Sequence, residues 1–211
     1  MAPGLSRAEA GLPPNGFVFC NFNQSYKLTP ETFGSWMRIL SRVEGSALWL
    51  LEGPAPYAEN LARHAQAHGI APARILFAPD RPQDQHLARL SLADLFLDGL
   101  PYNAHTTGSD ALWAGVPVLT RRGTAFPGRV GASLLQAAGL PELVTESQQD
   151  YEDLAVRLAT QPDALAAIKA KLTRSCPLFD TDLFRRNIEA AYLRMWEIFL
   201  AGEPPQAFDV N

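Results

Sequence analysis

The amino-acid sequence predicts an α/β fold, a Rossmann-like doubly wound parallel sheet of about six strands. Short apolar runs alternate with segments whose apolar residues recur at helical spacing. Most of these runs are continuous, as is typical of strands that are buried on both faces. Repeated strand–helix units form parallel sheets through right-handed crossovers, so we expect the strand order 3-2-1-4-5-6.

Each predicted element has a local signal. The six strands are predicted from the apolar runs Phe17–Cys20, Ala47–Leu51, Arg74–Phe77, Ala93–Asp98, Val116–Thr120 and Leu143–Val144. Thr29 before Pro30 is typical of a helix N-terminus, and Gly69 of the end of a helix that begins at Tyr57. Further helices are predicted around His86, from Thr106 onward, and over Gln148–Thr160, Asp163–Arg174 and Asp180–Leu200.

Length and composition limit the class of protein. The 211 residues are enough for one large domain or two small ones. We assign residues 1–16 to a lead-in, 17–202 to one Rossmann-like domain and 203–211 to a tail. The net charge of −4 argues against a nucleic-acid partner, and no apolar run approaches the ~18 residues of a membrane span. Cys20 and Cys176 lie in apolar surroundings and are expected to be reduced, which points to the cytoplasm.

Two polar connections fall where this fold binds ligands. In a doubly wound sheet, ligands bind outside the carboxyl ends of the strands, in the crevice between strands 1 and 4. The first strand is followed by NFNQSYK and the fourth by GLPYNAHTTGSD. These are the most polar connections in the chain, so the sequence predicts the ligand site between them.

The connection after the fourth strand has the composition of an anion site. A helix that begins near Thr106 would leave its first N–H groups without partners, next to the hydroxyls of Thr106 and Thr107. Together with the positive end of the helix dipole, these groups suit a phosphate. Asp110, one turn later, could accept hydrogen bonds from two sugar hydroxyls. For this segment alone the simpler interpretation stays open, with Thr106 as an ordinary N-cap and His105 as a polar turn residue.

Three more residues extend this candidate site. No G-x-G-x-x-G follows the first strand, which argues against NAD and FAD. Lys27 would face the threonine turn and neutralise the same phosphate, or it is a solvated lysine before a helix. His86 and Arg89 are three residues apart and share a helix face, so they could stack on a base and hydrogen-bond its edge. A surface histidine is the simpler interpretation of His86.

We expect no metal and no cofactor. His64 and His68 are four residues apart, but they lack a third ligand and the glutamate of an H-E-x-x-H motif. Neither cysteine has the spacing of a metal ligand.

Four segments of the chain carry a family resemblance: SRAEAGLP, FCNFNQSYKLTPETFGSWMRILSRVEGSALWLL, ADLFLDGLPYNAHTTGSDALWAGVPVLT and RVGASLL. They resemble the C-terminal part of protein O-GlcNAc transferases. The resemblance extends over about residues 5–200 and is to glycosyltransferase family 41, which also contains the SPINDLY-type fucosyltransferases. It implies one lobe of a two-lobed, GT-B type enzyme, in which the C-terminal lobe carries most of the site for the donor UDP-GlcNAc.

The resemblance also implies a role for each candidate residue. Lys27 is similar to the essential lysine on the UDP diphosphate, and Gln24 lies beside it. Arg81 and Gln83 are also implied at the nucleotide-sugar site, although Gln83 stands where the animal enzymes have a lysine beside the uracil. The other implied contacts are the diphosphate for Thr106 and Thr107, the sugar for His105, the ribose for Asp110, uracil stacking for His86 and uridine for Arg89.

The resemblance covers only part of such an enzyme. The second lobe and the TPR repeats, through which acceptor proteins bind, have no counterpart in the 211 residues. We therefore expect a donor-binding lobe that transfers nothing by itself. Its expected partners are a UDP-sugar and, through the missing regions, a protein whose Ser or Thr is modified. Two alternatives stay open: a related transferase with another donor, such as GDP-fucose, and a non-catalytic module that binds nucleotide or protein.

Overall fold

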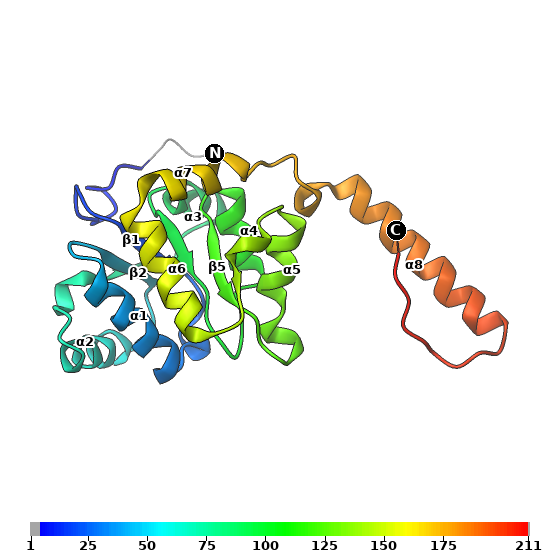
Figure 1. Cartoon of the computed structure of the whole chain (residues 1–211), viewed down its shortest axis with the longest axis horizontal. Coiled ribbons are helices and arrows are strands. Elements are labelled where there is room, and N and C mark those ends of the chain that lie inside the picture. Colours follow the sequence, from blue (N-terminus) through cyan, green and yellow to red (C-terminus); the bar gives the residue numbers. More distant parts are fainter. Residues whose placement is uncertain (1–4, 211) are drawn as a thin grey trace. The chain divides into compact units, whose positions relative to one another are not determined.

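The computed structural model describes residues 5–210 and contains the predicted parallel sheet (Figure 1). Its six strands have the order β3-β2-β1-β4-β5-β6 and all pairs are parallel, so the predicted order 3-2-1-4-5-6 is confirmed. The strands are β1 (Val18–Asn21), β2 (Ala47–Leu51), β3 (Ile75–Ala78), β4 (Leu95–Leu97), β5 (Val118–Arg121) and β6 (Val144–Thr145).

Helices connect these strands, and most were predicted. They are α1 (Pro30–Arg42), α2 (Tyr57–Ala67), α3 (Gln83–Leu90), α4 (Thr106–Trp113), α5 (Val130–Ala137), α6 (Gln148–Thr160), α7 (Pro162–Lys171) and α8 (Thr181–Leu200). The sequence analysis missed α5, because no side chain caps its N-terminus and its first turn contains Gly131.

The ends of two helices follow the expected chemistry. The hydroxyl of Thr29 accepts a hydrogen bond from the backbone N–H of Thr32 at 3.2 Å, which makes Thr29 the N-cap of α1. Gly69 has φ +75°, the left-handed conformation that ends a helix, directly after α2. Local side-chain chemistry thus determines where these helices begin and end.

The helices cover both faces of the sheet. Right-handed crossovers leave β1 in one direction and β4 in the other, which places α1 and α2 on one face and α3, α4 and α5 on the other. After β6 the chain returns to the first face, where α6 packs on α1 (Figure 1). The central strands are therefore fully buried, and the side chains of Phe19, Leu95 and Phe96 have no exposed surface.

The structure divides the chain after Thr173 into two compact units. The sequence analysis assigned residues 17–202 to one domain, whereas the structure places α8 in the second unit. Asp180 caps this helix, since its carboxylate accepts from the N–H of Leu183 at 2.8 Å. Among the described residues, no helix is both long and apolar enough to cross a membrane.

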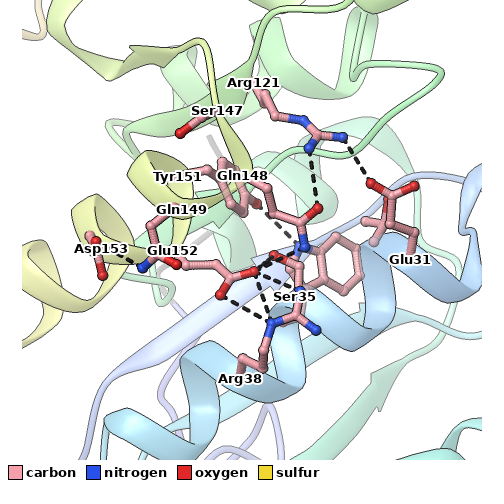
Figure 2. A network of polar contacts seen from close by, with 12 residues as sticks. Glu31, Ser35, Arg38, Arg121, Ser147, Gln148, Gln149, Tyr151, Glu152 and Asp153 are labelled. Atoms are coloured by element: carbon pink, nitrogen blue, oxygen red, sulfur yellow. Dashed lines mark hydrogen bonds and ion pairs between the residues drawn. The ribbon is translucent and has the colours of Figure 1, made fainter.

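A polar network joins α1 to α6 and β5 (Figure 2). The carboxylate of Glu152 is buried and accepts hydrogen bonds from Ser35 at 2.8 Å, from Gln148 at 3.1 Å and from two nitrogens of Arg38, the shorter at 2.7 Å. Burial raises the pKa of Glu152, but these hydrogen bonds outweigh burial and lower it. Glu152 therefore stays ionised and stabilises the packing of α6 on α1.

The network gives a stability prediction. Arg38→Met leaves the buried Glu152 carboxylate without its cation, so we expect the free energy of unfolding to fall by about 1–3 kcal/mol. The pKa of Glu152 is lower in the folded protein than in the unfolded chain, so its carboxylate stabilises the fold above the unfolded pKa. The loss of stability in Arg38→Met should therefore shrink as the pH falls through the folded pKa of Glu152. Chemical denaturation of the wild-type protein and Arg38→Met at two pH values measures this difference in the free energy of unfolding.

Arg42→Met is the matched control. Arg42 also pairs with an aspartate of α6, Asp153, but both side chains are about half exposed. Such exposed pairs contribute below about 1 kcal/mol. Equal losses from the two variants would show that the burial of Glu152 is unimportant.

Candidate functional site

The two polar connections singled out in the sequence meet at the carboxyl edge of the sheet. β1 and β4 are neighbours, and the side chain of Asn21 donates to the carbonyl of Leu97 at 2.7 Å. Asn23, two residues on, accepts a hydrogen bond from the hydroxyl of Thr107 at 2.5 Å. The end of β1 is thereby connected to the first turn of α4, which follows β4.

The N-terminus of α4 has no cap. His105 occupies the N-cap position but makes no capping hydrogen bond with its side chain. Its carbonyl accepts from the N–H groups of Gly108 and Ser109, and the N–H groups of Thr106 and Thr107 have no acceptor within the described chain. Thr106 is exposed. Two free N–H groups at the positive end of the helix can bind an anion.

Lys27 lies in the connection after β1, whereas α4 follows β4. It ends the single 3-10 turn Ser25–Lys27 after β1, and its ammonium donates to the carbonyl of Asn103 at 3.3 Å. Partial burial lowers the pKa of Lys27, and the carboxylate of Asp98 offsets part of this effect. Within the described chain no carboxylate lies at ion-pair distance from Lys27, so its charge is available to a ligand.

A buried carboxylate shapes the loop between β4 and α4. Asp98 is 2% exposed and accepts hydrogen bonds from the N–H groups of Gly99 at 2.8 Å and Ala104 at 2.6 Å, and from the hydroxyl of Thr120 at 2.7 Å. Burial raises the pKa of Asp98 to about 7, although these hydrogen bonds and Lys27 lower it. The side chain of Asp98 thus connects both ends of the loop 99–104 to β5.

Asn103 completes this loop. Its backbone N–H donates to Pro127 at 2.9 Å, its amide nitrogen donates to Gly99 at 2.9 Å, and its amide oxygen accepts from the N–H of Gly131 at 3.1 Å. Its carbonyl accepts from Lys27. All four polar groups of this fully buried residue are thus used, which orients the backbone that leads into α4.

His86 and Arg89 share one face of α3, as predicted. Arg89 donates to Nδ1 of His86 from Nε at 3.2 Å, to the carbonyl of Pro79, and lies 4.9 Å from the centre of the Phe22 ring. Burial first, and then the charge of Arg89, lower the pKa of His86. Because Nδ1 accepts from Arg89, the neutral ring carries its proton on Nε2 and can donate it to a ligand.

Arg89 itself is a buried cation. It is 3% exposed, and burial lowers its pKa, with Arg81 as the next cause. None of its described partners is a carboxylate. A buried charge is costly unless it is paired, so a guanidinium held this way is suited to a ligand that brings oxygen acceptors.

The remaining predicted residues lie on the same edge. The amide of Gln83 donates to Asp110 at 3.1 Å, which connects α3 to α4. Gln24 and Arg81 are exposed, and neither side chain has a partner within the described chain. Arg81 and Arg89 also line a hollow of about 390 Å³ beside α3. All ten predicted site residues thus belong to the connections after β1, β3 and β4.

The groups gathered here can bind a ligand that carries both an anionic group and a planar ring. Lys27 and the N-terminus of α4 supply positive charge, and His86 with Arg89 supplies a flat surface and hydrogen-bond donors. Among the described residues no group of three His, Cys, Asp or Glu could hold a metal ion.

Four residues of the site escaped the sequence analysis. They are Asn23, Asp98, Tyr102 and Asn103, which contact the predicted residues or the loop that carries them. Asp98 was included in an apolar run, although a carboxylate at the end of a buried strand is itself a signal, because buried charge needs several partners. The other three could be found only once the loops were placed side by side.

The sheet order defines a Rossmann-like lobe, and its likeness to solved glycosyltransferases makes it one lobe of a GT-B type fold. The chain belongs to glycosyl transferase family 41, since the model of this family matches residues 4–188.

Known proteins resemble the chain over nearly its whole length. It is 41% identical over 208 residues to the probable UDP-N-acetylglucosamine–peptide N-acetylglucosaminyltransferase SEC of Arabidopsis thaliana, covering 97% of this chain and 21% of the relative. The corresponding enzyme of Caenorhabditis elegans is 40% identical over 202 residues, covering 94% of this chain and 18% of the relative.

A solved structure supports the same relation. The K341M mutant of the Thermobaculum terrenum O-GlcNAc transferase matches with a TM-score of 0.80 at 34% identity, over 86% of this chain and 36% of that one. The chain thus spans about a fifth of the length of the curated relatives it matches.

Asp98 makes the stability of the loop depend on pH. Its folded pKa of about 7 lies above the unfolded value of about 3.9, so the folded state binds the proton more tightly. The free energy of unfolding should therefore fall as the pH rises between these values, by up to ~1.4 kcal/mol per pH unit. Asp98→Asn removes this titration and should flatten the profile, measured by denaturation from pH 5 to pH 8.

The exposed Asp84 serves as the control position. Asp84→Asn should leave the pH profile of the wild-type protein in place. A profile that Asp98→Asn does not change would show that another group titrates in this range.

Proposed function

We propose that this chain is the donor-binding lobe of a protein O-linked N-acetylglucosaminyltransferase that uses UDP-GlcNAc to modify Ser or Thr. The observation that carries the proposal is the uncapped N-terminus of α4 beside Lys27, a cation without an ion-pair partner in the described chain. A diphosphate needs this combination of fixed positive charge and free N–H donors.

In this proposal the diphosphate lies between the two connections. Lys27 and the N–H groups of Thr106 and Thr107 bind its oxygens, with Gln24 beside them and His105 on the sugar side. In the structure the hydroxyl of Thr107 donates to Asn23. In the proposed complex it donates to the diphosphate, which replaces Asn23 as the acceptor. The ribose hydroxyls lie at Asp110, which Gln83 orients.

The base is proposed to lie on α3. His86 stacks on uracil and Arg89 donates to its carbonyl oxygens, with Arg81 nearby. The lowered pKa of His86 keeps the ring neutral, so stacking costs no desolvation of a charged imidazole. The orientation of His86 is determined by Arg89, which holds Nδ1.

The proposed role of the lobe is to stabilise the leaving group. When the bond between the anomeric carbon and the diphosphate oxygen breaks, its electron pair stays on UDP. The acceptor hydroxyl oxygen forms the new bond to that carbon and releases its proton to solvent, so the products are UDP and the glycosylated acceptor. Lys27 and the end of α4 stabilise the charge that develops on UDP by electrostatics fixed in advance, which needs no metal.

The relatives support the donor and the acceptor class. The names of the Arabidopsis and C. elegans proteins state the transfer of N-acetylglucosamine to peptide. Because this chain spans about a fifth of those proteins, we propose that the acceptor protein binds through regions outside it.

Binding of UDP tests the anion site. We expect UDP to bind without added magnesium. Lys27→Ala and Thr107→Val should each weaken binding by about ten- to a hundredfold, because each removes a hydrogen-bonding group at the diphosphate, worth ~1.5–3 kcal/mol when charge-assisted. Isothermal titration calorimetry measures the affinities. Thr107→Ser and Lys171→Ala are the matched controls and should bind normally, and undiminished binding by both test variants would refute the site.

Base preference tests the role of α3. His86→Ala should weaken UDP binding and reduce the preference for UDP over GDP and ADP, since stacking on an aromatic ring is worth ~1–3 kcal/mol per base. The exposed His64→Ala is the control. A preference for GDP in the wild-type protein would instead favour a GDP-fucose donor, and an unchanged preference in His86→Ala would place the base elsewhere.

Transfer by the chain itself is the third test. We expect the 211 residues to bind the donor and transfer nothing, because positioning of the acceptor can supply roughly 7–11 kcal/mol of the barrier and the proposed acceptor regions lie outside this chain. Labelled UDP-GlcNAc and a protein acceptor are incubated with the chain, alone and with the second lobe of a relative added. Glycosylation by the chain alone would show that the catalytic unit is complete.

A further inference from the structure

Two groups of the described chain contact the ammonium of Lys27. One is the carbonyl of Asn103, and the other is the ring of Tyr102, whose centre lies 4.0 Å from Nζ. The carboxylate of Asp98, directly after β4, raises the pKa of Lys27 by its charge, and it already accepts three hydrogen bonds from other groups. The Tyr102 ring therefore adds negative potential to that of Asp98 around the partly buried Lys27.

The same ring contacts a second site residue. Tyr102 stacks on His105, with the ring centres 4.8 Å apart and the planes at 28°. Tyr102 is 39% exposed, and within the described chain its hydroxyl makes no hydrogen bond. Its contacts to the site are thus made by the ring and do not depend on the hydroxyl.

We propose that Tyr102 is a positioning residue whose ring holds the Lys27 ammonium and the His105 imidazole in place at the diphosphate site. This inference rests on the proposed function for its purpose. The geometry itself does not, because Lys27 comes from the loop after β1 and Tyr102 and His105 come from the loop after β4, and the Tyr102 ring contacts both Lys27 and His105. A ring in this place keeps a flexible lysine charged and aimed at the end of α4.

The titration of Lys27 without nucleotide tests the contact directly. The chain has three lysines, Lys27, Lys169 and Lys171, so the protein labelled with ¹³C-lysine gives few ε-carbon resonances. Lys27→Arg identifies the resonance of Lys27. Tyr102→Leu removes the ring and should lower the pKa of Lys27 further, because burial then acts with less opposition.

Binding of UDP gives the functional readout. Tyr102→Leu should weaken UDP about two- to fivefold, as expected for a partly exposed cation–π contact, and should move the alkaline limit of binding to lower pH. Tyr102→Phe keeps the ring and should match the wild-type protein in both measurements. Tyr102→Trp should raise the pKa of Lys27, which gives a second test if Tyr102→Leu does not fold.

Tyr26→Leu is the matched control. Tyr26 precedes Lys27, is 79% exposed and makes no aromatic or cation–π contact within the described chain, so its loss should leave Lys27 unchanged. Identical titrations of Lys27 in the wild-type protein, Tyr102→Leu and Tyr102→Trp would overturn the inference, even if UDP binds. If UDP does not bind the wild-type protein, the proposed function fails, and the Lys27 titration alone decides the role of the ring.

Discussion

The structure depends on how the carboxyl ends of β1 and β4 are joined. The connections after β1 and β4 lead to opposite sides of the sheet, which leaves a crevice between the ends of these two strands. The backbone beyond the strand ends has no neighbouring strand to hydrogen-bond with. Buried side chains supply the missing partners: Asn21 reaches Leu97, and Asp98 gathers two N–H groups and a hydroxyl. The loops that carry the candidate site have one arrangement because these buried polar groups must be satisfied.

This arrangement separates structural groups from groups free to bind. Asp98 and Asn103 are buried and use their polar atoms within the protein. Within the described chain, Lys27 has no ion-pair partner and the N–H groups of Thr106 and Thr107 have no acceptor. Such a division is what electrostatic preorganisation requires, because the donors are held in place before any ligand arrives.

Burial also determines the protonation states around the site. The same desolvation that raises the pKa of Asp98 lowers those of Lys27 and His86. For His86 the result is a neutral ring with a fixed tautomer, and for Lys27 it is a cation that needs nearby negative potential. The Tyr102 ring and the Asp98 carboxylate supply this potential from two elements of the fold.

The sequence by itself determined the sheet, its order and the candidate residues. Continuous apolar runs and helix caps such as Thr29 are local signals, since burial on two faces and capping each depend on neighbouring residues. The polar residues after β1 and β4, Lys27 and Thr107 among them, were found because parallel strands end at one edge. Only the tertiary structure decided which groups contact each other, that Asp98 organises the loop and that Tyr102 touches Lys27. These contacts join residues about 75 positions apart or depend on loop geometry, and no local pattern encodes them.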